Sequence, residues 1–306
     1  MQAALEGIEI FRQEFGDRFQ ENVILAPYTS ARIGGPADIL ITVMSRDELI
    51  HSIQFCQTAK IPMIVIGGGS NLLVSDLGFR GAVILNKAKK SILINEEPPI
   101  LQAESGVVLS NLAHRCAAQG LAGLEWAATI PGTVGGAVYG NAGAFGSDIA
   151  RNLKRAEILT VDGISWWPVE KMEYGYRSSV LKIKYQGAYI LRAEFELVKG
   201  SIEALKSTIE IFSTRRKATQ PPGASMGSMF KNPDGDYAGR LIEAANLKGM
   251  RVGNAEISPI HANFFINHGQ TLAKDIKTLI LLAQQNVKEK FNVDLDLEIE
   301  FIGEWE

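Results

Sequence analysis

The fold is indicated first by residues 37–71, which read ADILITVMSRDELIHSIQFCQTAKIPMIVIGGGSN. Residues 39–43 form a short apolar run typical of a strand. Ser45 and Glu48 then form a capping box, which predicts the start of a helix. Residues 61–66 return to a strand pattern and lead into a run of glycines. The stretch therefore predicts a strand, a helix and a second strand that opens onto a glycine loop.

The rest of the chain alternates further helices and strands. Helical spacing and end signals predict helices at residues 109–119, from residue 202 to before Gln220, and from residue 272 to about 291. Apolar runs predict strands at residues 156–161, 188–197 and 295–302. The chain is expected to have an α+β fold.

Composition excludes several classes of function. The chain has 306 residues, enough for about two domains of ordinary size. Its formal net charge is −3, so no global positive field would attract a nucleic acid or an anionic membrane. Two cysteines and four histidines occur without the spacing of a metal site. We expect no bound metal and reduced thiols.

The chain carries no predicted targeting or membrane segment. Its N-terminus lacks a basic stretch followed by an apolar run, so a cytoplasmic protein is expected. Residues 126–145 lack formal charge over the length of a membrane span, but Pro131, Asn141 and five glycines argue against a helix in lipid.

Two glycine loops predict a large ligand that contains phosphate. The first, at residues 67–71, lacks the third glycine of a dinucleotide fingerprint because Leu72 stands there, and the chain has no P-loop lysine. The second covers residues 130–144 and is uncharged. Glycine backbones can approach phosphate oxygens closely. Ser70, Asn71, Thr129 and Asn141 add hydroxyl and amide groups.

Five motifs in order resemble the UDP-N-acetylenolpyruvoylglucosamine reductase family, also called UDP-N-acetylmuramate dehydrogenases. They are YTSARIGG (28–35), GGGSNLL (67–73), EWAATIPGTVGGA (125–137), YRSS (176–179) and GSMFKNP (227–233). The resemblance covers nearly the whole chain and matches the shorter type of the family, without a large insertion after Arg177.

The resemblance implies an FAD-binding fold of the vanillyl-alcohol-oxidase type, in two subdomains with a C-terminal α+β substrate domain. The expected boundaries are residues 1–85, 86–200 and 201–306. FAD would bind without a covalent link, since neither glycine loop contains a histidine. The implied FAD-binding residues are Gly67, Gly68, Gly69, Ser70, Asn71, Leu72, Thr129, Ile130, Gly132, Thr133, Gly135, Gly136, Ala137, Asn141, Ala142 and Gly143.

The family reaction reduces an enolpyruvyl double bond in peptidoglycan precursor synthesis. NADPH, the co-substrate, gives hydride to FAD, and the reduced flavin gives hydride to a UDP-sugar substrate. Charge that develops at C2 and the adjoining carboxylate needs a cation and a proton donor. By resemblance, Arg177 engages the carboxylate, Ser228 donates the proton and Glu298 stabilises the enolic intermediate.

Further residues match the family less directly. Glu300 would share a strand face with Glu298 and competes for its role, and family members usually carry a basic residue there. Lys231 and Asn232 are candidates for the substrate diphosphate, and Lys231 is also the nearest proton relay to Ser228 in sequence. His261 is either a substrate ligand or a buried structural histidine. We expect a monomer with small-molecule ligands and no nucleic acid or membrane partner.

Three alternative functions are also considered for this sequence. Residues 223–227 satisfy the G-x-S-x-G pattern of serine hydrolases, but Pro221 and Pro222 stand where the preceding strand should be. The same FAD fold could serve an aldonolactone or aryl-alcohol oxidase that uses oxygen. A flavin-free binding module is the third, although Arg177, Ser228 and Glu298 are all present.

Overall fold

The chain folds into two compact units in the computed structural model, which describes residues 2–185 and 187–305. Unit 1 comprises Met1–Gln20, Leu40–Gly67 and Ala82–Arg215, and unit 2 comprises Glu21–Ile39, Gly68–Gly81 and Arg216–Glu306. The predicted boundaries at residues 85 and 200 divide the chain differently, and the three-part division stays a prediction.

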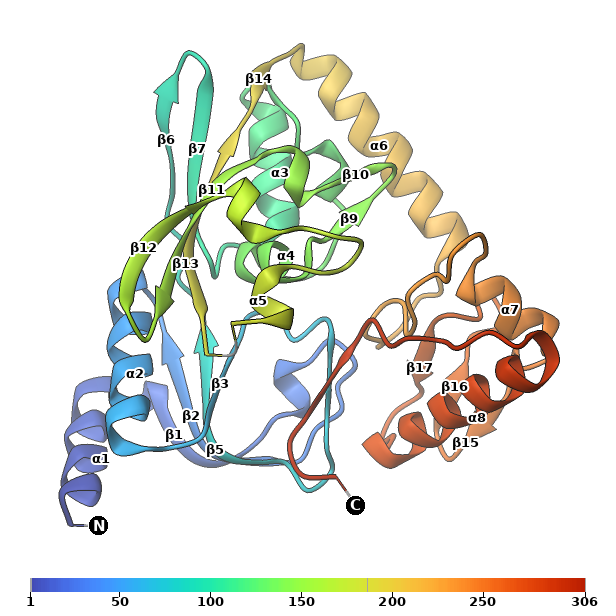
Figure 1. The fold of residues 1–306 in the computed structure, drawn as a ribbon, viewed down its shortest axis with the longest axis horizontal. Coiled ribbons are helices and arrows are strands. Elements are labelled where there is room, and N and C mark those ends of the chain that lie inside the picture. Colours follow the sequence, from blue (N-terminus) through green and yellow to red (C-terminus); the bar gives the residue numbers. More distant parts are fainter. Residues whose placement is uncertain (1, 186, 306) are drawn as a thin grey trace. The chain divides into compact units, whose positions relative to one another are not determined.

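A five-stranded antiparallel sheet forms the centre of unit 1 (Figure 1). Its strand order is β12 (Gly163–Pro168), β11 (Leu153–Thr160), β13 (Tyr189–Glu196), β7 (Pro99–Glu104) and β6 (Ser91–Glu96). Apolar residues of β7, β11 and β13 share one core with residues of α3 (Leu109–Ala118) and α4 (Val134–Gly140). Burial of this apolar surface stabilises the unit and fixes the segment around α4.

A four-stranded sheet contains the predicted strand–helix–strand stretch. Its order is β1 (Phe19–Ile24), β2 (Pro36–Val43), β5 (Phe79–Asn86) and β3 (Met63–Ile66). The helix between β2 and β3 is α2 (Arg46–Ala59), whose N-cap Ser45 side chain accepts a hydrogen bond from Glu48 N–H. The predicted stretch is confirmed, and β5, which pairs parallel with β3, stands between its two strands.

Unit 2 contains a three-stranded antiparallel sheet and two helices. The sheet order is β15 (Arg251–Val252), β16 (Ala255–Ile257) and β17 (Phe265–Asn267). Helices α7 (Ala238–Ala244) and α8 (Ala273–Phe291) bury apolar residues in the same core as the sheet. Strand β18 (Glu300–Ile302) pairs parallel with β4 (Leu72–Val74).

The remaining elements are three helices, four two-residue strands and five short 3-10 helices among the described residues. They are α1 (Gln2–Phe15), α5 (Val180–Ile183), α6 (Ile202–Thr219), β8 (Leu121–Ala122), β9 (Gly143–Ala144), β10 (Ser147–Asp148) and β14 (Val198–Lys199), with short 3-10 helices at Gly16–Arg18, Ala26–Tyr28, Glu125–Ala127, Ile149–Arg151 and Val169–Met172. Within the described ranges, no helix is long and apolar enough to cross a membrane.

The predicted helices are confirmed as α3, α6 and α8, and Gly120 takes the left-handed φ of +70° expected after α3. The predicted strand at residues 295–302 is wrong over most of its length. Only residues 300–302 form β18, and Leu297 makes an isolated bridge to Phe230. A strand needs a partner along its whole length, which an apolar pattern alone does not reveal.

Candidate active site

The first glycine loop owes its glycines to close protein neighbours. A Cβ on Gly67 would lie 2.2 Å from the Oγ1 atom of Thr133, within unit 1. Gly69, within unit 2, has a φ of +57°, and a Cβ there would lie 2.3 Å from the Tyr28 carbonyl oxygen. A side chain at Gly67 would clash with the side chain of Thr133, and one at Gly69 would clash with the Tyr28 backbone, so both positions favour glycine.

The second predicted FAD segment contains a buried hydroxyl that no described residue satisfies. The Oγ1 atom of Thr129 is buried and has no hydrogen-bond partner within the part of the chain that the structure describes. A buried polar atom without a partner is costly, and its usual explanation is a water, an ion or a ligand. The chemistry of this segment, a hydroxyl beside uncharged glycine backbone, fits a bound FAD.

Asn141 follows α4 and holds a second loop in place. It takes a left-handed φ of 47° at the helix C-cap and is 4% exposed. Its Nδ2 donates to the Gly175 carbonyl at 3.0 Å, and its Oδ1 accepts from Ala150 N–H at 3.1 Å. The Asn141 side chain thus connects α4 to the loop at residues 173–179, which carries Arg177.

Two hydroxyl groups strengthen this connection. Ser179 Oγ donates to the Tyr139 carbonyl at 2.6 Å, and Tyr174 Oη donates to the Val138 carbonyl at 2.8 Å. Burial raises the pKa of Tyr174, so its hydroxyl remains a donor throughout the ordinary pH range. The Arg177 loop is therefore anchored on both sides of the arginine to the last turn of α4.

Arg177 itself takes an uncommon backbone conformation. Its φ is 53°, a left-handed value that costs energy for a residue with a side chain. Its Nη2 atom donates to the Gly143 carbonyl at 2.7 Å, and its guanidinium lies over the Tyr176 ring at 5.2 Å. The loop thus directs the guanidinium toward the end of the second predicted FAD segment, within unit 1.

Ser228 and Glu298 lie on neighbouring segments of unit 2. Met229, next to Ser228, accepts a hydrogen bond at its carbonyl from Glu298 N–H at 2.9 Å. Asn71 Nδ2 donates to the Glu298 carbonyl at 3.0 Å, so the first glycine loop reaches the same place. The structure therefore brings together Ser228, Glu298 and Asn71, which are far apart in sequence.

Asn263 is a residue that sequence reasoning missed. Its backbone carbonyl accepts from Met229 N–H at 2.8 Å, and both ends of its buried side chain bind the backbone of Phe230. It therefore fixes the segment that follows Ser228. It lies in the segment at residues 261–267, but no local pattern there shows that its side chain bonds Phe230.

The predicted substrate residues of unit 2 differ in how they are held. Asn232 Oδ1 accepts from Ala238 N–H at 3.1 Å, which caps α7. Lys231 is half-buried, and its backbone N–H donates to the Asp296 carbonyl at 2.8 Å. Burial lowers the pKa of His261, whose Nδ1 accepts from Asn263 N–H at 3.3 Å. At neutral pH His261 is uncharged, with a proton on Nε2.

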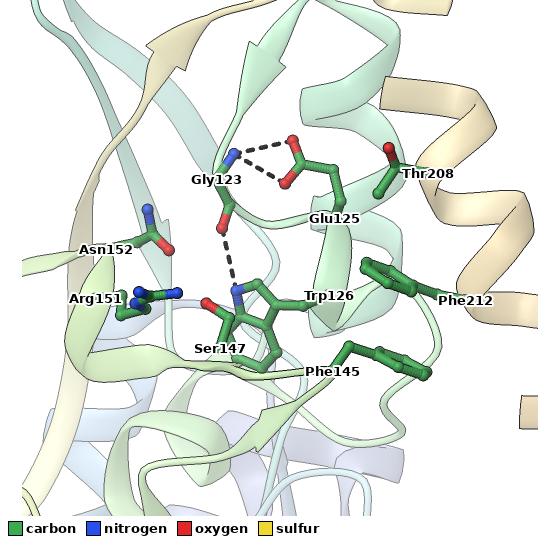
Figure 2. Close-up of a pocket in the computed structure, with 9 residues that line it drawn as sticks. All are labelled: Gly123, Glu125, Trp126, Phe145, Ser147, Arg151, Asn152, Thr208 and Phe212. Atoms are coloured by element: carbon green, nitrogen blue, oxygen red, sulfur yellow. Dashed lines mark hydrogen bonds between the residues drawn. The ribbon is translucent and has the colours of Figure 1, made fainter. Parts of the chain in front are cut away.

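A cavity lies within unit 1 (Figure 2). It has a volume of about 400 Å³, and its lining comprises Gly123, Glu125, Trp126, Phe145, Ser147, Arg151, Asn152, Thr208 and Phe212. Glu125 and Trp126 point back to Gly123 through hydrogen bonds of 3.0 to 3.1 Å. None of the predicted site residues lines it.

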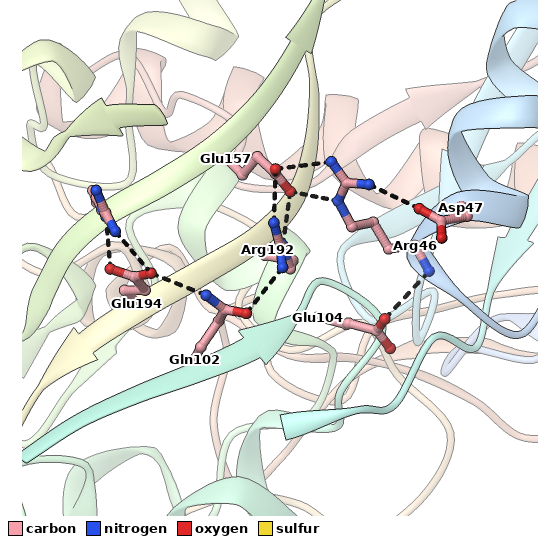
Figure 3. Close-up of polar contacts among 8 residues, drawn as sticks. Arg46, Asp47, Gln102, Glu104, Glu157, Arg192 and Glu194 are labelled. Carbon is pink, nitrogen blue, oxygen red and sulfur yellow. Dashed lines mark hydrogen bonds and ion pairs between the residues drawn. The ribbon is translucent and has the colours of Figure 1, made fainter. Parts of the chain in front are cut away.

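A buried ionic network joins α2 to the five-stranded sheet of unit 1 (Figure 3). Glu157, 4% exposed, accepts paired hydrogen bonds of 2.7 and 2.8 Å from Arg46 and 2.8 Å from Arg192. Gln102 connects Arg192 to Glu194, each at 3.0 Å. All of these contacts join residues of unit 1, and they connect α2 to β7, β11 and β13.

Cysteine and metal chemistry have little support in the geometry. Cys56 and Cys116 are buried free thiols, and burial raises the pKa of Cys56 to about 11 and that of Cys116 to about 12. Such thiols are poor nucleophiles at neutral pH. Throughout residues 2–185 and 187–305, no group of three or more histidine, cysteine and carboxylate side chains is arranged to hold a metal ion.

Two family models match separate parts of the chain. Residues 37–167 match the FAD binding domain, and residues 218–302 match the C-terminal domain of UDP-N-acetylenolpyruvoylglucosamine reductase. The predicted fold class, an FAD-binding fold followed by a C-terminal α+β domain, is confirmed.

Relatives match over nearly the full length. The UDP-N-acetylenolpyruvoylglucosamine reductase of Chloroflexus aggregans is 44% identical over 92% of this chain and 96% of its own. The reductase 1 of Bacillus anthracis is 45% identical over 91% of this chain and 93% of its own. The crystal structure of the Thermus caldophilus reductase has a TM-score of 0.78 and 35% identity, and covers 92% of this chain and 97% of its own. On this identity and coverage, together with the two matched domains, the chain belongs to the UDP-N-acetylenolpyruvoylglucosamine reductase family.

Proposed function

We infer that this chain reduces the enolpyruvyl group of UDP-N-acetylglucosamine enolpyruvate to UDP-N-acetylmuramate, a step of peptidoglycan precursor synthesis. The observation that carries the proposal is the junction in unit 2 at which Glu298 N–H binds the carbonyl of Met229, the neighbour of Ser228. Two groups able to handle protons are thus fixed on adjacent segments of a chain whose relatives are named for this reaction.

FAD is the redox cofactor of the proposal, and when bound it carries hydride from NADPH to the substrate. Thr129 supports this assignment, because its buried hydroxyl lacks a partner within the described residues. The proposed FAD-binding residues are those of the two glycine segments at positions 67–72 and 129–143. For Asn141 we propose an indirect role, since its side chain already binds Gly175 and Ala150.

Arg177 is assigned to the carboxylate of the substrate. Reduction of the enolpyruvyl double bond builds negative charge at C2 and the adjoining carboxylate. A guanidinium remains charged at every relevant pH and offers a planar set of donors that matches a carboxylate. The hydrogen bond from Nη2 to Gly143 orients this set, which lowers the entropic cost of binding.

Ser228 and Glu298 are assigned to proton transfer at C2 and to stabilisation of the enolic oxygen. A serine hydroxyl is a weak acid, so a neighbouring group must stabilise the alkoxide that it leaves. Lys231 is proposed for that role and, with Asn232, for the diphosphate of the substrate. His261, uncharged at neutral pH, would donate a hydrogen bond from Nε2 to the substrate. A cytoplasmic location is part of the same proposal, since UDP-sugar precursors are made there.

The proposal is tested by the visible spectrum of the purified protein. Anaerobic NADPH should bleach a bound flavin, and UDP-N-acetylglucosamine enolpyruvate should then restore its colour. NADH in place of NADPH establishes the preference for the co-substrate. A protein that FAD cannot reconstitute would contradict the proposal. A reduced flavin that only oxygen reoxidises would instead indicate an oxidase with the same fold.

A further inference from the structure

Strand β6 is an edge strand of the five-stranded sheet in unit 1, and it carries three consecutive exposed apolar residues (Figure 1). Ile92, Leu93 and Ile94 are 44%, 41% and 43% exposed. Folded proteins usually protect such an edge, because its outward N–H and C=O groups can pair with a strand from another chain. An apolar run on an edge is therefore a potential interaction surface.

The hydrogen-bonding pattern shows which backbone N–H and C=O groups of β6 point away from β7. Glu104 N–H donates to the Lys90 carbonyl at 2.9 Å, and the register places Ser91 opposite Ala103 on β7. In an antiparallel ladder, the backbone groups of successive residues point alternately toward the partner strand and away from it. Since Lys90 faces β7, the backbone groups of Ser91 and Leu93 face the open edge.

The sequence around Leu93 is self-complementary in charge. Residues 89–97 read KKSILINEE, with two lysines before the apolar run and two glutamates after it. If two copies meet antiparallel with Leu93 opposite Leu93, each Lys89 faces a Glu97 and each Lys90 faces a Glu96. A parallel pair in register would set lysine against lysine and glutamate against glutamate, which is unfavourable. The charges therefore select one orientation.

Contacts within the chain do not prevent this pairing. Lys199 contacts Glu97, but both side chains are largely exposed, and exposed ion pairs contribute little. The register of β6 against β7 shifts between Leu93 and Asn95, which adds local twist and keeps the pairing short. A short strand pair buries less surface than a stable dimer needs, so the association should be weak.

We propose that β6 is a self-association surface, and that two copies of this chain pair antiparallel through it, about Leu93, to form a weak homodimer. This differs from the monomer expected from the sequence. The apolar side chains and outward backbone groups supply the affinity, and the flanking lysines and glutamates set the register and direction.

Sedimentation measurements over a range of protein concentrations test the proposal on the FAD-loaded protein. The wild-type chain should shift from monomer to dimer as its concentration rises. Leu93→Lys places two like charges on the symmetry axis and should raise the dimer dissociation constant at least tenfold. The matched control is Ile164→Lys, since Ile164 is 43% exposed on β12, the opposite edge of the same sheet. A monomer at every concentration, or a dimer that survives Leu93→Lys, overturns the proposal.

Charge reversal tests the antiparallel register. Lys89→Glu with Lys90→Glu, and separately Glu96→Lys with Glu97→Lys, should each weaken the homodimer at least tenfold. A mixture of the two variants should form a heterodimer, because every facing pair is again of opposite charge. A mixture that stays monomeric would overturn the antiparallel arrangement, while far-ultraviolet circular dichroism and flavin absorbance confirm that both variants are folded.

Amide hydrogen exchange locates the contact. Exchange at Leu93 should slow as the protein concentration rises, and exchange on β12 should not change. A dimer without this protection would place the interface elsewhere and contradict the proposal.

Discussion

Asn263 holds Phe230 through both ends of its side-chain amide. Its Oδ1 accepts from Phe230 N–H at 2.9 Å, and its Nδ2 donates to the Phe230 carbonyl at 2.8 Å. Asn263 is 3% exposed, so water cannot readily replace these bonds. The carbonyl of Met229, next to Phe230, accepts a hydrogen bond from Glu298 N–H. Asn263 therefore helps to position the backbone beside both Ser228 and Glu298, the two residues proposed for proton transfer.

Asn263→Asp should slow the reaction of reduced flavin with the enolpyruvyl substrate at least tenfold and leave reduction by NADPH within twofold. The carboxylate keeps the acceptor but loses the donor to Phe230, which shifts Ser228. Stopped-flow measurement of the two half-reactions checks this. Val287→Ala, in the buried face of α8, is the control for general destabilisation of unit 2. Equal slowing of both half-reactions would leave Asn263 with a structural role alone.

Ser228→Ala should slow reoxidation of the flavin by the substrate by roughly 10² to 10⁴. Reduction by NADPH needs no proton at C2 and should be nearly unchanged. Ser225→Ala is the matched control, because Ser225 occupies the serine position of the G-x-S-x-G pattern at residues 223–227. Equal slowing of both steps by Ser228→Ala would remove it from the proton-donor role. Equal slowing of the reoxidation step by Ser225→Ala would show that the effect is not specific to Ser228.

Glu298→Ala should reduce the rate of the substrate half-reaction at least a hundredfold, and Glu300→Ala should change it less than threefold. Both carboxylates are partly exposed, but Glu298 precedes β18 and binds next to Ser228, whereas Glu300 lies in the parallel pair with β4. Single-turnover kinetics with pre-reduced enzyme decide between them. The reverse pattern would transfer the role to Glu300.

Thr129→Val should weaken FAD binding by about 5 to 10-fold, equivalent to about 1 kcal/mol, without destabilising the FAD-free protein. Valine keeps the shape of threonine and removes only the hydroxyl, which has no partner within the described residues. Flavin titration gives the affinity, and urea unfolding of the FAD-free protein gives the stability. An unchanged FAD affinity would show that this hydroxyl does not contact the cofactor.

Glu157→Gln should lower the free energy of unfolding at pH 7 by about 2 kcal/mol, since it removes a buried charge that accepts hydrogen bonds from two arginines. Burial raises the pKa of Glu157, but hydrogen bonds from Arg192 and Arg46 outweigh it and hold the pKa below the ordinary value of 4.5.

A lowered folded-state pKa stabilises the protein above pH 4.5, and this contribution is lost as the pH falls through the folded-state value. The difference between wild type and Glu157→Gln should therefore shrink on acidification below pH 4.5, as urea unfolding at several pH values would show. Asp47→Asn is the control, because Asp47 also pairs with Arg46 but its side chain is 87% exposed. A difference independent of pH would contradict this account.

Elements with local signals were predicted well. The Ser45 side chain caps α2 by accepting a hydrogen bond from Glu48 N–H, as the capping box indicates. The second bond of the box differs, because the Glu48 carboxylate accepts from Met44 N–H at 2.7 Å and not from Ser45 N–H. Helix spacing and glycine stops depend on residues a few positions apart, so α2, α3 and α8 can be found from the chain alone. The ordered motifs likewise identified the family, because each is a contiguous run.

What only the tertiary structure decided depends on residues far apart in sequence. The strand expected at residues 295–302 shortened to β18, because its pairing is with β4, more than 220 positions earlier. Asn263 has its role because it hydrogen-bonds Phe230, and Asn141 because it hydrogen-bonds Gly175. The sequence alone therefore determined the fold class, the family and the chemical groups available. Long-range hydrogen bonds, which no local pattern encodes, decided which of those groups meet and which residues hold them there.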